Sequence, residues 1–152
     1  MPKNFEKFHI TQGAMIIKDD KCLVVQFSDE HGKKHKDCWD IPGGRIDVGE
    51  ADKSEQAFRR EIKEELGILN FDIIDLVAHD IWKNAVGDPI CALIYLIDNP
   101  NTYDIKLSHE HKNFKWIRED EIKDKFLWPG ATKMLKKGFK RYKKLKKQNG
   151  IN

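Results

Sequence analysis

The segment from Gly43 to Ile68 constrains the fold most, because it joins a glycine-rich turn directly to a strongly patterned helix. Residues 54–66 predict that helix, since Phe58, Ile62 and Leu66 recur at i, i+4 and i+8 and would form one buried stripe. A helix with a single apolar stripe must pack that stripe against another layer. The segment therefore predicts a layered domain with a glycine turn held next to the start of a packed helix.

Both ends of this helix carry termination signals. Asp52, followed three residues later by Glu55, predicts a capping box at the start. Gly67 directly follows the last apolar position and predicts the C-terminal stop.

Three glutamates share one face of the predicted helix. Glu61, Glu64 and Glu65 lie at i, i+3 and i+4, which places neighbouring Cβ atoms ~5–6 Å apart. Hard divalent cations take oxygen ligands and suit such a cluster. Taken alone, the helix is better explained as a solvated face on which Arg60 and Lys63 balance the acids, because glutamate is a good helix former.

The loop before the helix changes that interpretation. Gly43, Gly44 and Gly49 permit close approach of the backbone to a ligand. The loop leads from a short strand, residues 38–41, into the helix start, where backbone amides can face a phosphate. Glycines and carboxylates in this order predict a site for a metal-bound phosphate ester.

The rest of the chain supplies strands and a second helix. The expected strands cover residues 13–18, 21–27, 71–82, 88–98 and 112–117, with a hairpin turn at Asp19–Asp20 and a turn at 84–87. Strands interleaved with two substantial helices predict an α/β (α+β) fold, a mixed sheet sandwiched between helices. We expect residues 1–152 to form a single domain, because no linker or internal repeat divides them.

Composition excludes several other classes of protein. The longest apolar run, Ile90 to Ile97, is too short to span a bilayer. The first ten residues contain charges and no apolar core of a secretory signal. Cys22, Cys38 and Cys91 form no paired pattern, and we interpret them as reduced thiols of a cytoplasmic protein.

The C-terminal segment from Lys133 to Lys147 is strongly basic. It holds nine Lys and Arg residues and no acid; the remaining 19 basic and 25 acidic residues give a net charge of −6. Leu135, Phe139 and Tyr142 recur at helical spacing and predict a helix packed along one stripe, with the lysines in solvent. The alternative is that the basic residues steer polyanions toward the protein.

The segment around the glutamate helix resembles the signature of the Nudix (MutT-like) hydrolases. Gly44, Glu50 and residues 60–68, REIKEELGI, supply each named element of that signature. One departure is that nine residues rather than seven separate Glu50 from Arg60. The two extra residues fall in 51–54, a turn before the helix that tolerates insertions. The resemblance implies the Nudix fold, an α-β-α sandwich.

The resemblance also implies the chemistry of the site. In the family, the signature glutamates hold Mg²⁺ or Mn²⁺ on a diphosphate that water then attacks. Glu64 and Glu65 would be the principal metal ligands, and Glu61 a further ligand or the base that activates water. Arg60 would orient a carboxylate, namely Glu50, rather than contact substrate.

Four further residues complete the expected site. Gly43 and Gly44 would contribute backbone groups to metal or phosphate binding, with Gly44 counted among the metal ligands. Arg45 would contact the substrate. Glu110 would be an additional ligand or general base, although a loop carboxylate beside Lys112 is an equally good interpretation.

The expected function is metal-dependent hydrolysis of a pyrophosphate bond in a nucleoside diphosphate-linked substrate, such as a nucleoside triphosphate or a modified nucleotide. Two alternatives remain: hydrolysis at the 5′ end of an RNA gripped by residues 133–147, and a non-catalytic nucleotide-binding module. The resemblance leaves a homodimer open. Aromatic residues that could stack on a base are Phe27, Trp39, Trp82 and Trp116.

Overall fold

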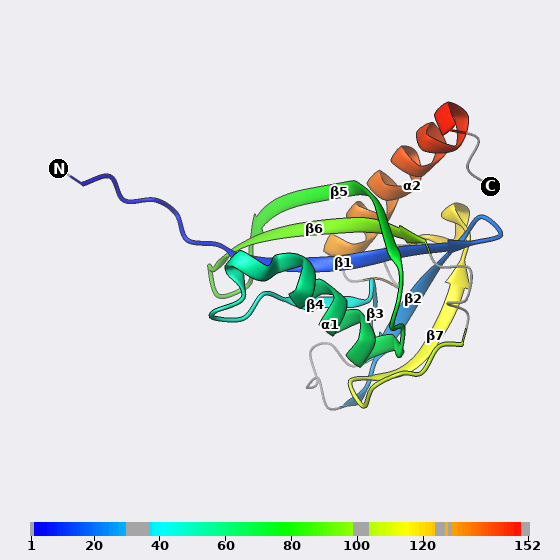
Figure 1. Cartoon of the computed structure of the whole chain (residues 1–152), viewed down its shortest axis with the longest axis horizontal. Coiled ribbons are helices and arrows are strands. Elements are labelled where there is room, and N and C mark those ends of the chain that lie inside the picture. The colour runs from blue at the N-terminus through cyan, green and yellow to red at the C-terminus, as the bar shows by residue number, and fades with distance from the viewer. Residues whose placement is uncertain (1, 30–36, 99–103, 124–126, 128, 150–152) are drawn as a thin grey trace.

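The computed structural model describes residues 2–29, 37–98, 104–123, 127 and 129–149 (Figure 1). Its two α-helices are α1 (Ser54–Leu66) and α2 (Pro129–Asn149), and short 3₁₀ turns cover Ala51–Lys53 and Glu119–Glu121. The strands are β1 (His9–Lys18), β2 (Lys21–Phe27), β3 (Trp39–Asp40), β4 (Gly43–Arg45), β5 (Asp72–Lys83), β6 (Pro89–Asp98) and β7 (His111–Ile117).

The strands form one mixed sheet in the order β3-β2-β1-β6-β5, with β4 also paired to β1 and β7 to β2. β1 runs parallel to β6, whereas the other pairings are antiparallel. The predicted hairpin between β1 and β2 is present, with positive φ at both Asp19 and Asp20. The mixed sheet expected from the sequence is therefore confirmed.

The two helices cover opposite faces of the sheet (Figure 1). Ala14 and Ile16 of β1 pack with the stripe of α1, and the intervening Met15 packs with the stripe of α2. This alternation follows from the two-residue period of a strand. Both predicted stripes are buried: Phe58, Ile62 and Leu66 on α1; Leu135, Phe139 and Tyr142 on α2.

The start of α1 differs from the prediction. Lys53 occupies the N-cap position, and no side chain caps the helix, so the capping box from Asp52 to Glu55 is wrong. The residues around the insertion form a 3₁₀ turn that runs into the helix and displaces Asp52 from the cap position. The other end is as predicted: Gly67 adopts φ 71°, and its N–H bonds to the carbonyl of Lys63.

The three cysteines are free thiols in different surroundings. Cys22 is fully buried under the α2 layer, and burial raises the pKa of its thiol to about 12. Because the thiolate is the reactive species, we expect iodoacetamide at pH 8 to alkylate the half-buried Cys38 and Cys91 long before Cys22. Mass spectrometry of the native and urea-unfolded protein measures this order. Equal native labelling of all three thiols would contradict this packing.

Among the described helices, none is long and apolar enough to cross a membrane.

Candidate active site

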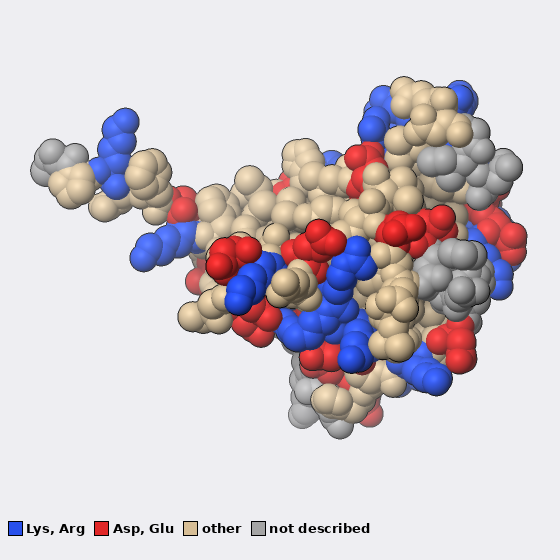
Figure 2. Space-filling model, in the orientation of Figure 1, with Lys and Arg blue, Asp and Glu red and all other residues tan. Residues whose placement is uncertain are grey.

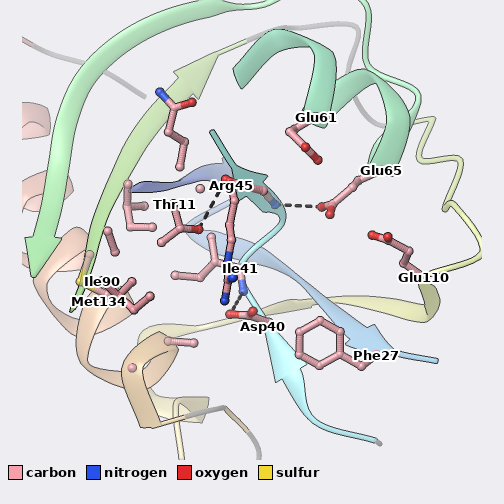
Figure 3. A pocket seen from close by; sticks show the side chains of 18 of the residues that line it. Thr11, Phe27, Asp40, Ile41, Arg45, Glu61, Glu65, Ile90, Glu110 and Met134 are labelled. Carbon is pink, nitrogen blue, oxygen red and sulfur yellow. Dashed lines mark hydrogen bonds between the residues drawn. The ribbon is translucent and has the colours of Figure 1, made fainter. Parts of the chain in front are cut away.

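An open pocket of about 520 Å³ lies where α1, the β3–β4 turn, β6 and the first turns of α2 meet (Figure 3). One end is polar and contains most of the residues expected from the sequence: Gly43, Gly44, Arg45, Glu61, Glu65 and Glu110. The other end is largely apolar, with Trp82, Ile90, Ala92, Ile94, Ala131 and Met134. The pocket can therefore hold a ligand that is charged at one end and flat or apolar at the other.

Two glutamates of α1 enter the polar end. Glu61 and Glu65 are one helical turn apart and both face the pocket (Figure 3). Glu65 is buried, with 5% of its surface exposed, and its Oε2 accepts a hydrogen bond of 2.8 Å from the N–H of Gly43. Glu64 does not line the pocket; its side chain is 56% exposed and lies 3.1 Å from Nη1 of Arg60.

The two glycines are required by close contacts rather than by a turn alone. A Cβ atom at Gly44 would lie 2.2 Å from the carboxyl carbon of Glu61. A Cβ atom at Gly43 would lie 2.0 Å from the backbone oxygen of Gln12 on β1. Gly43 thus allows β4 to pair with β1, and Gly44 allows the Glu61 carboxylate to rest directly on the turn.

Glu110 reaches the same end of the pocket from the chain just before β7 (Figure 3). Its N–H bonds to Oγ of Ser108 and its carbonyl accepts a bond from the N–H of Ser28, which fixes the local backbone. The next residue, His111, is buried and stacks on Phe27 at a centroid distance of 5.5 Å. The fold therefore brings Glu110 to Glu61 and Glu65 across some fifty residues of sequence, while His109 is exposed and outside the lining.

Burial raises the pKa values of three pocket acids, and neighbouring carboxylates raise two of them further. Burial, together with the charges of Glu61, Glu110 and Asp40, raises the pKa of Glu65 to about 9 despite the Gly43 hydrogen bond. Burial raises the pKa of Asp40 to about 7 and also raises that of Glu61. Because these acids repel one another when they are ionised together, a bound cation would stabilise their ionised forms.

The donor set fits a hard divalent cation. Carboxylate and backbone oxygens are the ligands that Mg²⁺ and Mn²⁺ take, and neither Glu65 nor Glu110 pairs with a base in the described part of the chain. Among the same residues, no three acidic, histidine or cysteine side chains already lie at the spacing of a closed metal site. Ion binding would therefore require these side chains to draw closer together.

Arg60 organises the carboxylates behind the pocket. Its Nε and Nη2 atoms each lie 3.1 Å from an oxygen of Glu50, a two-pronged contact. The same guanidinium lies 3.2 Å from Glu61 and 3.1 Å from Glu64. The N–H of Asp47, and then Arg60, hold the pKa of Glu50 below its usual value. The two-residue insertion thus leaves Glu50 at Arg60, where the sequence analysis expected it.

Sequence reasoning missed Asp40 and the apolar wall. Asp40 lines the pocket, and the available signal was an acid in the otherwise apolar strand that precedes Pro42. The apolar wall is formed by residues of β5, β6 and α2, and contacts between such distant elements cannot be predicted from a local sequence pattern. Of the four aromatic candidates, Phe27 and Trp82 line the pocket, whereas Trp39 lies under Lys115 and Trp116 packs on the α1 side of the core.

Comparisons with known proteins agree with this geometry. The chain is 39% identical over 88 residues to the asymmetrical bis(5′-nucleosyl)-tetraphosphatase of Caenorhabditis elegans, a match covering 56% of this chain and 62% of that protein. It is 35% identical over 78 residues to the 8-oxo-dGTP diphosphatase of Proteus vulgaris, covering 49% and 65%. Each match thus spans less than two thirds of the relative.

Two further comparisons cover most of the chain. The MutT protein of Methanosarcina mazei Go1 has the same fold, with a TM-score of 0.70 at 22% identity over 96% of this chain and 100% of that one. The sequence model of the NUDIX domain matches residues 7–138. Together with the glycine turn and the pocket glutamates, this match shows that the chain belongs to the NUDIX domain family.

Proposed function

We propose that the protein hydrolyses a pyrophosphate bond in a nucleoside diphosphate-linked substrate, such as a nucleoside triphosphate or a modified nucleotide, with Mg²⁺ or Mn²⁺. The observation that carries this proposal is the convergence of Glu61, Glu65 and Glu110 on the Gly43–Gly44 turn, within a pocket whose opposite end is apolar.

Metal binding is assigned to the polar end. Glu61, Glu65 and the carbonyl of Gly44 would hold the ion, and Glu64 would join them after rotating away from Arg60. A divalent ion at this position supplies charge neutralisation on the phosphoryl oxygens and lowers the pKa of water. Because the signature glutamates are all present, we favour a catalytic protein over a non-catalytic module that only binds nucleotides.

The remaining residues position the reacting groups. Glu110 faces Glu61 and Glu65 from a separate element and would be a further ligand or accept the proton of the attacking water. Arg60 holds Glu50 and Glu64 and acts as a positioning residue for the glutamates. Arg45 is exposed at the pocket and would contact the departing phosphate groups.

The apolar end would accept the nucleoside. Trp82 offers a flat face, and Ile90 and Met134 form an apolar surface beside it. The names of the two relatives, which refer to a dinucleoside tetraphosphate and to an oxidised dGTP, support a nucleotide as the ligand.

The test is release of phosphate and pyrophosphate from a panel of nucleoside triphosphates, oxidised nucleotides, nucleotide sugars and dinucleoside polyphosphates. Each substrate is assayed with Mg²⁺, with Mn²⁺ and with EDTA. We expect cleavage of at least one class with metal and none with EDTA. A correctly folded protein that cleaves nothing on this panel, with either metal, would exclude hydrolysis of small nucleotides.

A further inference from the structure

The first residues of the chain project from the body as an extended arm. Residues 2–8 precede β1, and all of them are exposed. In the described part of the chain, no hydrogen bond, ion pair or ring contact joins them to another residue. They lead away from the body instead of folding back over the sheet (Figure 1). We call residues 2–8 the N-terminal arm.

The N-terminal arm carries two aromatic side chains and a positive charge. Phe5 is 81% exposed and Phe8 is 39% exposed, so neither ring gains the free energy of full burial. Two lysines, Lys3 and Lys7, outnumber the one acid, Glu6, which gives these side chains a net charge of +1. Such a segment is suited to an apolar surface that has acids at its border.

The sheet presents an apolar area on the side that carries α1. Tyr95 of β6 lies on this side, because its ring packs 5.1 Å from that of Phe58 on α1. Every second residue of β6 faces the same way, and so do the residues paired with them on β1 and β5. Besides Tyr95, the apolar residues on this side include Ile10 on β1, Leu76 and Ile81 on β5, and Cys91 and Leu93 on β6.

α1 leaves these five residues uncovered, and we call them the open sheet face. Ile81 is 60% exposed and Leu76 is 42% exposed, and the other three are half-buried. Figure 1 shows β5 and β6 extending past α1, and Figure 2, in the same orientation, shows mostly uncharged surface over them. An apolar sheet face normally packs against another layer, so this one is expected to bind a further surface.

A polar hollow of about 540 Å³ borders the open sheet face at the start of α1. Its charged lining consists of two acids, Glu55 and Asp72, and one base, Arg59, so its net charge is opposite to that of the arm. Gln12 also lines the hollow and is only 4% exposed, yet its side-chain amide forms no hydrogen bond with the described residues. A peptide backbone supplies both the donor and the acceptor that a buried amide requires.

We propose that the open sheet face binds the N-terminal arm of a second copy of this chain, and that the two copies exchange arms reciprocally. Phe5 and Phe8 cover the apolar strands of the partner, and the lysines of the arm lie toward Glu55 and Asp72. The backbone of the arm bonds to the amide of Gln12.

The dimensions of the arm agree with this exchange. Seven extended residues span about 23–25 Å, whereas β1, β6 and β5 together are only about 10 Å wide. The arm starts at β1, which is itself part of the open sheet face, and leads away from its own body. Two copies related by a two-fold axis at this end of the sheet would therefore each place an arm on the face of the other.

The test is the mass in solution, measured by sedimentation equilibrium on the wild type and three double variants. The substitutions are Phe5→Ser and Phe8→Ser in the arm variant, Leu76→Glu and Ile81→Glu in the face variant, and Leu69→Glu and Phe114→Ser in the control. Leu69 and Phe114 are 65% and 40% exposed and lie outside both surfaces. We expect the wild type and the control to have twice the chain mass of 17.8 kDa. The dissociation constant of the arm variant and of the face variant should rise by about 100-fold.

Mixing the arm variant with the face variant tests the exchange itself. A mixed pair keeps one intact contact, between the unaltered arm of the face variant and the unaltered face of the arm variant. The mixture should therefore form dimers at concentrations at which each variant alone is monomeric. Circular dichroism checks that all the variants fold, and the arm variant alters only residues outside the folded body.

Four results would overturn the proposal. A wild type that is monomeric at about 100 μM would show that no second copy occupies the open sheet face. A dimer that persists in the arm variant must use another surface. An equal loss of dimer in the control would show that the effect is not specific to the arm and the face. Failure of the two folded variants to dimerise on mixing would exclude the reciprocal contact.

Discussion

Replacing Glu65 with Gln is expected to reduce metal-dependent hydrolysis by about 100- to 1,000-fold, the effect of losing several kcal/mol of stabilisation of the transition state. Glu65 is the most buried of the pocket acids and lies against the Gly43–Gly44 turn. Glutamine has nearly the same shape, and its carbonyl oxygen can still accept the Gly43 N–H. The substitution therefore removes the charge and one metal-binding oxygen while leaving the packing intact.

Without metal, the free energy of unfolding of Glu65→Gln should depend less on pH than that of the wild type. The pKa of Glu65 is raised to about 9 in the folded protein from 4.5, so the folded state retains a proton that the unfolded chain releases. Stability contributed by that proton is complete below pH 4.5 and is lost as the pH rises toward 9. Glutamine cannot ionise, so urea unfolding in EDTA should show a free energy of unfolding for Glu65→Gln that declines less between pH 6 and 9.

The matched control is Glu55→Gln on the same helix. Glu55 is exposed and pairs with Arg59 on the surface, so its loss should leave both activity and the pH dependence unchanged. Full activity in Glu65→Gln would remove Glu65 from the site. If the free energy of unfolding of Glu65→Gln declined more steeply with pH than that of the wild type, this would contradict the burial of the Glu65 carboxyl group.

Local patterns predicted the elements of this fold well. The stripes of α1 and α2 and the stop at Gly67 all depend on residues within a few turns of one another, and all are confirmed. The predicted capping box is wrong although it is also a local pattern. The residues before α1 form a 3₁₀ turn, and the sequence pattern could not distinguish this turn from a helix cap.

The site was predictable in its parts but not in its assembly. Spacing placed Glu61, Glu64 and Glu65 on one face, yet only two of them enter the pocket. Glu64 instead pairs with Arg60. The Arg60 guanidinium binds Glu50 and also donates a hydrogen bond to Glu64, one helical turn further along α1. Such competition among charged partners depends on side-chain geometry, which spacing does not determine. Asp40 and the apolar wall depend on contacts between distant strands, which a single sequence does not report.

The paired glycines offer the second large effect, because their contacts differ in kind. We expect Gly44→Ala to remain folded and to lose activity by about 100-fold. The three atoms nearest to the new Cβ all belong to the Glu61 side chain, a flexible group that can rotate away. Its stability should stay within about 1 kcal/mol of the wild type. Displacing that carboxylate by an ångström or more from the reacting groups is enough for a loss of this size.

Gly43→Ala should instead destabilise the fold. Its Cβ would meet the backbone of Gln12 and Gly13, which can retreat only if β1 and β4 separate. We expect a loss of about 3 kcal/mol, or a fall in Tm of about 6–12 °C. Thermal unfolding and metal-dependent hydrolysis, measured on both variants, test the pair together. If Gly44→Ala keeps wild-type turnover, then the contact between that turn and Glu61 does not position the carboxylate for catalysis. If Gly43→Ala melts with the wild type, then β4 is not held by β1 at this residue.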